Sequence, residues 1–206
     1  MKKWMMPLFL SLETAAYLLI LDSSGKWVCF GSVAVCFAYS LFAGCNGKFQ
    51  AALGFTVAAD WCLVVCDPIQ RLWGMVAFLV VQSLYAAQLY QRRNWWLWIR
   101  LGAVATAEAV AALVLGKGMD LLAAVSMAYY AMLVMNLAQA VAQRRSRFAI
   151  ALTLFLLCDT VVGLQVAGDL YISTEVRLLY PGFNLAWMFY LPAQVLLALE
   201  SGNEGK

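Results

Sequence analysis

Long runs of apolar residues, separated by short polar turns, make up nearly the whole chain. A helix needs about 20 mostly apolar residues to cross the hydrocarbon core of a bilayer. Gly, Pro, Asn and charged residues between the runs are typical of tight reversals. The pattern predicts an all-α, polytopic membrane helix bundle in a single transmembrane domain. About eight spans are expected in residues 1–206, at about 4–21, 27–43, 48–66, 71–91, 95–116, 119–142, 147–168 and 178–199.

Basic residues are unevenly divided between the two ends of these spans. Nine lie on the side of the N-terminus and four on the opposite side, while Arg100 falls within the fifth span. Lys and Arg accumulate in cytoplasmic loops, so both termini are predicted to be cytoplasmic in a multi-pass protein of a bacterial-type cell membrane. Because Glu13 interrupts the first run and no small-x-small cleavage site follows, this run is expected to be a retained span.

Composition supports the membrane class and narrows the chemistry. The chain is 65% hydrophobic and 12% charged, and its small net charge of +3 is scattered, so nucleic-acid binding is not expected. There are no histidines, which removes the commonest zinc ligand and the usual partner of a nucleophilic Ser or Cys. The six cysteines form no C-x-x-C motif. No metal and no cofactor are therefore predicted, and the oligomeric state stays open.

Four acidic residues lie inside the odd-numbered spans, at intervals of about 48 residues: Glu13, Asp60, Glu108 and Asp159. An ionisable side chain at the bilayer centre costs about 2.5–3.5 kcal/mol on insertion scales, so such residues usually face the bundle interior. The interval matches one two-helix hairpin, as an old hairpin repeat would give. Glu13 and Glu108 fit a purely structural role, hydrogen-bonded between helices, as well as a functional one. Asp60 and Asp159 are too short to reach either surface.

Even-numbered spans contribute amides and phenols at helical spacing. Side chains three or four residues apart share a helix face, so each set is predicted to point inward: Gln82 with Tyr85, Tyr129 and Tyr130 with Asn136 and Gln139, and Tyr190 with Gln194. Most tryptophans lie where interfacial belts are expected. Trp61 and Trp187 lie deeper, beside polar residues, and are predicted to line a cavity.

Four short segments resemble motifs of the YhhN (lysoplasmalogenase) family. They are the run that ends in Asp60, the Gln82-Ser-Leu-Tyr85 segment, the RFAIALTLFLLCD run that ends in Asp159, and the Tyr190-Leu-Pro-Ala-Gln194 segment. They occur in the family's order, and the resemblance covers roughly residues 48–200. Two positions depart from it: Gln82 replaces a histidine, and Cys158 replaces a residue that is often serine.

The resemblance implies hydrolysis of the vinyl ether of a lysoplasmalogen to a fatty aldehyde and a glycerophospho-headgroup, with lysophospholipid as substrate and membrane lipid as surroundings. Protonation of a vinyl ether needs an acid that is neutral at pH 7, and two carboxyls sharing a buried site can divide the roles of acid and base. Asp60 and Asp159 are the predicted catalytic pair. The predicted substrate-binding residues are Gln82, Tyr85, Tyr190, Gln194, Glu13 and Glu108.

Two other functions remain open from the residues alone. Midplane carboxylates and short loops are also found in proton-coupled small-molecule transporters. A non-catalytic lipid-binding protein would use the same carboxyls only as hydrogen-bonding groups between helices.

Overall fold

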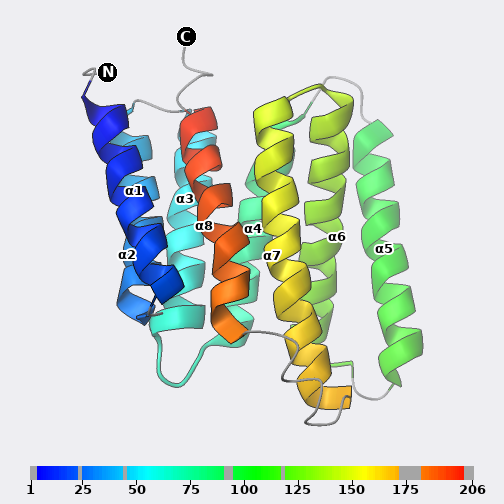
Figure 1. Cartoon of the computed structure of the whole chain (residues 1–206). Helices are drawn as coiled ribbons and strands as arrows, with labels where there is room; N and C mark the ends of the chain where they lie inside the picture. The colour runs from blue at the N-terminus through cyan, green and yellow to red at the C-terminus, as the bar shows by residue number, and fades with distance from the viewer. Residues whose placement is uncertain are drawn as a thin grey trace.

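The computed structural model describes residues 4–22, 25–43, 46–90, 95–116, 119–171 and 182–201. All secondary structure in these ranges is helical, and the helices lie side by side with their axes roughly aligned (Figure 1). They are α1 (Met5–Asp22), α2 (Lys26–Phe42), α3 (Gly47–Asp60), α4 (Arg71–Gln88), α5 (Trp95–Leu115), α6 (Leu121–Ala142), α7 (Ser146–Tyr171) and α8 (Gly182–Ser201), with a π-helical segment η1 (Trp61–Val65) that continues α3. The all-α fold is therefore confirmed, with eight α-helices within the described ranges.

Short polar caps set the start of two helices. The Asn46 side chain accepts a hydrogen bond from the Lys48 backbone N–H at 3.0 Å, and Asp120 accepts one from the Ala123 N–H at 2.7 Å. Such caps satisfy backbone donors that the first turn of a helix leaves free. The polar turns read from the sequence thus end one apolar run and begin the next.

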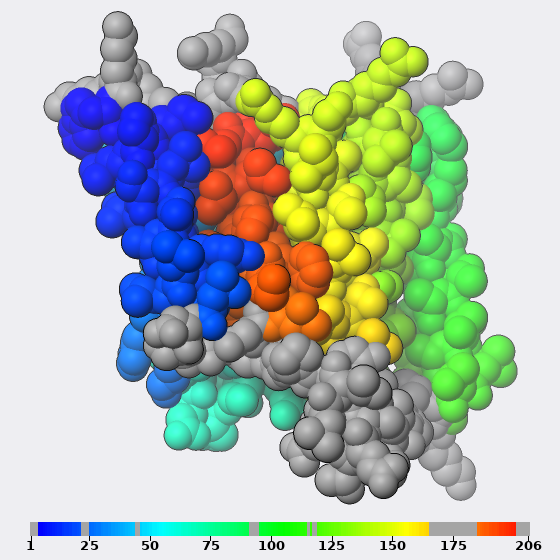
Figure 2. Space-filling model, in the orientation of Figure 1, coloured from blue at the N-terminus to red at the C-terminus, as the bar shows by residue number. Residues whose placement is uncertain are grey.

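The order of the helices in space differs from their order in the chain. Helix α8 returns to pack against α1, α2, α3 and α7, and it lies between α1 and α7 on the face seen in Figure 2. Helix α4 packs against α3, η1 and α6, while α5 contacts only α6 among the described elements and lies at the edge of the bundle (Figure 1). The described part of α1 begins, and that of α8 ends, at the same end of the bundle.

Four helical stretches are long and apolar enough to cross a membrane: Gly47–Val65, Trp95–Val114, Leu121–Ala142 and Ser146–Leu164. Met5–Leu21, Lys26–Phe42 and Leu185–Glu200 are shorter apolar helices. Many large apolar side chains face outward, among them Leu113, which is 85% exposed, whereas the polar Gln82 is fully buried. Apolar side chains facing lipid and polar side chains facing one another are expected of a helical membrane protein. The number of spans and their direction stay predictions.

One tryptophan prediction is wrong. Trp187 is buried and packs on Tyr190, as expected of an interior residue. Trp61 instead is 46% exposed and contacts the rings of Trp27 and Phe30 on the outer surface of α2. The chain becomes π-helical at Trp61, and depth in the span beside polar residues, on which the prediction relied, does not determine which way the side chain faces.

Candidate active site

Asp60 is the last residue of α3 and lies where the α-helix becomes π-helical. π-helical turns are frequent at functional sites. The Asp60 side chain is 3% exposed, and the phenolic O–H of Tyr190, from α8, lies 2.9 and 2.8 Å from its two carboxyl oxygens. Packing of α8 against α3 brings together two residues that are 130 positions apart in the chain.

A second tyrosine–aspartate pair joins α6 and α7. The Tyr129 O–H donates a hydrogen bond to an Asp159 carboxyl oxygen, and Asp159 is half-buried. The next residue on each helix forms a parallel contact, since the hydroxyls of Tyr130 and Thr160 lie 3.1 Å apart. The adjacent pairs fix the register of α6 against α7.

Aromatic rings connect the two pairs. Phe78 of α4 contacts the rings of Tyr129 and Tyr190, with centroid distances of 5.7 and 6.5 Å. Phe155 of α7 contacts Phe78 at 5.7 Å and Tyr190 at 5.4 Å. The Asp60 and Asp159 carboxyls are close enough to interact electrostatically. The structure thus brings these two predicted residues into one neighbourhood, here called the carboxylate cluster (Asp60, Asp159, Tyr129 and Tyr190).

Glu13 joins this neighbourhood from α1. One of its carboxyl oxygens accepts a hydrogen bond from the Cys36 thiol at 3.6 Å, and both side chains are buried. The Cys36 side chain interacts electrostatically with Glu13 and Asp60 alike. A third carboxyl therefore lies on the α1–α2 side of the cluster, hydrogen-bonded to a thiol that is within electrostatic range of Asp60.

Glu108 is not brought to the cluster. It lies half-buried on α5, which packs only on α6 within the described part of the chain. No hydrogen bond or ion pair joins it to another described residue. The position of an acidic residue inside an apolar span was therefore not sufficient to predict the grouping of all four, and the substrate-binding role of Glu108 stays a prediction without support from the contacts.

A model of the YhhN family matches residues 4–201. The chain belongs to the YhhN family. The predicted family is thereby confirmed, and the family and the long apolar helices together make this chain a helical integral membrane protein. No curated protein and no solved structure matches it.

The two departures from the YhhN motifs occupy different surroundings. Cys158 is 6% exposed and interacts electrostatically with both Asp60 and Asp159, so this position borders the carboxylate cluster. Gln82 is fully buried, and its side-chain oxygen accepts a hydrogen bond from the Asn136 amide at 2.8 Å. Gln82, which stands where the resemblance implies a histidine, thus forms a side-chain hydrogen bond with Asn136 that joins α4 to α6.

Gln82 belongs to a second buried polar group, here called the amide network (Gln82, Asn136, Gln139, Arg100 and the Leu89 carbonyl). Arg100 donates to the side-chain oxygens of Asn136 and Gln139, and Gln139 donates to the Leu89 carbonyl at 2.7 Å. Asn136 and Gln139 were predicted to share one inward helix face, whereas no role was predicted for Arg100. Its position within an apolar span was the signal that could have identified it.

Several buried polar atoms have no hydrogen-bond partner among the described residues. They are one carboxyl oxygen of Glu13, the Gln82 side-chain nitrogen, the Tyr85 hydroxyl and both amide atoms of Gln194. A buried polar group without a partner costs about 1–3 kcal/mol, so native proteins keep few of them. All four residues were among the predicted substrate-binding set, and these atoms are available to a polar ligand.

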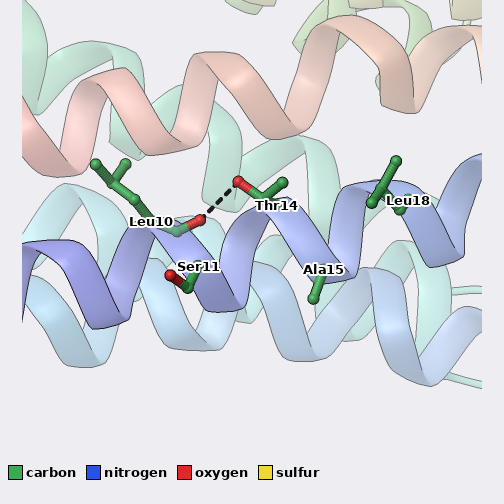
Figure 3. A pocket seen from close by; sticks show the side chains of 5 residues that line it. All are labelled: Leu10, Ser11, Thr14, Ala15 and Leu18. Carbon is green, nitrogen blue, oxygen red and sulfur yellow. Dashed lines mark hydrogen bonds between the residues drawn. The ribbon is translucent and has the colours of Figure 1, made fainter.

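Two hollows on the described part of the molecule lie away from Asp60 and Asp159. The larger, about 420 Å³, is an open groove on α1 lined by Leu10, Ser11, Thr14, Ala15 and Leu18 (Figure 3). There the Thr14 hydroxyl donates its proton to the Leu10 carbonyl at 2.7 Å, so this hydroxyl is not available to donate to a ligand. The second hollow, about 190 Å³, lies between α4, α5 and α6.

Proposed function

We propose that this YhhN protein is an intramembrane hydrolase that cleaves the vinyl ether bond of lysoplasmalogens. The observation that carries the proposal is the pairing of Asp60 with Tyr190 and of Asp159 with Tyr129 on the two sides of one aromatic core. Membership in the YhhN family supports the same reaction. Pairs of carboxyl groups held in the protein interior are typical of acid–base catalysis.

The reaction needs one acid and one base. The acid transfers a proton to the vinyl carbon remote from the ether oxygen, which leaves an oxocarbenium ion. Water then attacks the carbon bonded to oxygen while the second carboxylate takes its proton. The hemiacetal then gives its hydroxyl proton to the first carboxylate while the second carboxyl protonates the departing glycerol oxygen, and the bond between carbon and that oxygen breaks. A fatty aldehyde and the glycerophospho-headgroup are released, both carboxyls return to their starting states, and the net change is the addition of one water. Paired-carboxylate glycosidases pass through a similar oxocarbenium-like state.

We assign the proton donor from the difference in burial. Asp60 is 3% exposed, whereas Asp159 is half-buried. Withdrawal from solvent favours the neutral form of a carboxyl group, so Asp60 is the proposed acid. Asp159 is the proposed carboxylate that stabilises the oxocarbenium ion and activates water, and Tyr129 holds it in place by a charge-assisted hydrogen bond.

The buried polar atoms without partners would bind the polar parts of the reacting complex. Gln194 lies one helical turn beyond Tyr190 on α8, and its free amide can orient the attacking water. The free atoms of Tyr85, Gln82 and Glu13 are suited to the glycerol hydroxyl and a second water. These assignments give each of the four residues a partner in the reacting complex, either the substrate or a water.

The test is aldehyde release from a defined lysoplasmalogen by protein reconstituted in liposomes. Asp60→Asn and Asp159→Asn should each lower the rate by about 10²- to 10⁴-fold, because general acid–base catalysis contributes about that much. Asp120→Asn is the matched control, since Asn caps a helix as well as Asp and Asp120 lies exposed at the start of α6. Wild-type turnover in either cluster variant would refute the proposal. Proton-dependent solute flux, or bound lipid without turnover, would favour the transporter or the lipid-binding protein instead.

A further inference from the structure

Arg100 is a cation buried inside a predicted membrane span. It lies on the second turn of α5 and is 6% exposed. At a rise of about 1.5 Å per residue, its backbone lies roughly 8 Å from the start of the helix at Trp95. This depth corresponds to the boundary between lipid headgroups and acyl chains when Trp95 and Trp98 anchor the helix end at the interface.

The known partners of Arg100 are neutral. Its two hydrogen bonds go to the side-chain oxygens of Asn136 and Gln139, and no carboxylate in the described part of the chain forms an ion pair with it. A guanidinium group carries five N–H donors in a rigid fork. The two amides therefore fix its orientation while leaving its charge uncompensated and further donors free for an anion.

The guanidinium lines the hollow between α4, α5 and α6. The other lining residues are Ala86, Ala87, Tyr90, Trp96, Leu97 and Gln139, and the volume is about 190 Å³. The hollow thus combines a buried guanidinium with an apolar and aromatic wall.

We propose that this hollow binds the phosphate group of a lysophospholipid, with Arg100 as the specificity-determining residue. Arg matches phosphate with two parallel N–H···O bonds, which are among the stronger hydrogen bonds in proteins. The aromatic and apolar wall suits a ligand that continues into an acyl chain rather than a free ion. The identity of the phosphate as a substrate headgroup rests on the proposed hydrolase function, whereas its binding does not.

The spacing along α6 relates this hollow to the carboxylate cluster. Asn136, which holds Arg100, and Tyr129, which holds Asp159, are seven residues apart on the same face of the helix. Seven residues correspond to about 10 Å along the axis. A lysoplasmalogen places its phosphate and its vinyl ether at the two ends of the glycerol backbone, a separation of the same order.

Binding is tested with a lipid that the enzyme cannot cleave. The probes are a saturated 1-alkyl lysophosphocholine, the 1-alkylglycerol that lacks its headgroup, and inorganic phosphate, measured by thermophoresis on detergent-purified protein. Wild type should bind the alkyl lysophosphocholine at least about tenfold more tightly than the alkylglycerol, from the strength of hydrogen bonds to a charged group. Arg100→Gln should abolish this preference, and Arg100→Lys should retain part of it.

Two further variants separate the site from general effects. Arg147→Gln removes an exposed cation from the start of α7 and should leave the preference unchanged. Ala87→Trp fills the hollow from an exposed position and should lower lysophosphocholine affinity without touching the Arg100 hydrogen bonds. If Arg100→Gln does not give a cooperative melting transition, the affinity of Ala87→Trp is the measurement that tests the proposal.

An undiminished preference in Arg100→Gln and Ala87→Trp would overturn the proposal. Displacement of the lipid by equimolar inorganic phosphate would also overturn it, because the site would then be one for free phosphate. The hydrolase proposal fails separately, if the intact vinyl ether substrate binds without aldehyde release. If turnover occurs but Arg100→Gln leaves its KM unchanged, only the headgroup site fails.

Discussion

The carboxylate cluster and the amide network are two polar regions buried in the same apolar bundle, yet their hydrogen bonding differs. In the amide network, Asn136 bonds to Arg100 and Gln82, and Gln139 bonds to Arg100 and the Leu89 carbonyl. Around the carboxylate cluster, Glu13, Tyr85 and Gln194 keep buried polar atoms without partners among the described residues, whereas in the amide network only the Gln82 side-chain nitrogen does so within the same ranges. A mostly satisfied network rigidifies a structure, whereas unpaired buried groups are retained only at a cost. We therefore expect the first region to govern stability and the second to govern turnover.

The largest expected effect that separates the regions comes from the adjacent tyrosines of α6. Tyr129→Phe removes the hydrogen bond to Asp159 and keeps the ring, so the rate of aldehyde release should fall by roughly 10- to 100-fold. Tyr130→Phe is the matched control, because its hydroxyl contacts only that of Thr160 among the bonds described. Equal losses in both variants would mean that Tyr129 acts through α6–α7 packing rather than through the carboxylate.

A change in the amide network should act on stability instead. Asn136→Ala removes acceptors and donors used by Arg100 and Gln82, leaving buried groups unpaired. The free energy of unfolding should fall by about 1–3 kcal/mol, as measured by denaturant titration in mixed micelles. Turnover per folded molecule with a short-chain substrate at saturation should stay within about threefold of wild type. A loss as large as that of Tyr129→Phe would show that the two regions are one functional unit.

The smallest expected effect concerns Gln82, the member of the amide network at which the sequence departs from the family motif. Gln82→His restores the family's usual residue, and its ring can still accept a hydrogen bond from Asn136. Because Gln82 contacts neither aspartate in the described hydrogen bonds, and because the N–H of a histidine ring can replace the free amide N–H of Gln82 toward substrate or water, the rate at pH 7 should change by less than about fivefold. A histidine that takes part in catalysis would instead add an inflection to the pH–rate profile near its ordinary pKa of about 6.5. Gln82→Asn is the control without a titratable ring.

The helices and several site residues could be predicted from the sequence because both follow from local rules. Length and hydropathy predicted the helices, and midspan acidity singled out Asp60, Asp159 and Glu13, which the fold brings together. The same rule also selected Glu108, which lies on α5 at the edge of the bundle. Depth within a span is encoded locally, but which helices become neighbours depends on the packing of the whole chain.

Two further features depended on long-range or irregular structure. The hydrogen bond from Tyr190 to Asp60 requires α8 to return beside α3, and no periodicity in either segment specifies that contact. Trp61 faces outward at the start of the π-helical segment, and its depth in the span, on which its prediction relied, does not specify that direction. Arg100 was visible as a charge within a span, but its amide partners lie on α6, 36 and 39 positions away.

The central claim is that Asp60 and Asp159 act as one catalytic unit, and the double variant tests it most directly. Aldehyde release is measured under the same conditions for Asp60→Asn, Asp159→Asn and the variant carrying both substitutions. Residues that work as a unit have grossly non-additive effects, so the double variant should be no slower than the slower single variant, within about threefold. A rate equal to the product of the two single losses would contradict the account, because it would mean that the two carboxyls act independently.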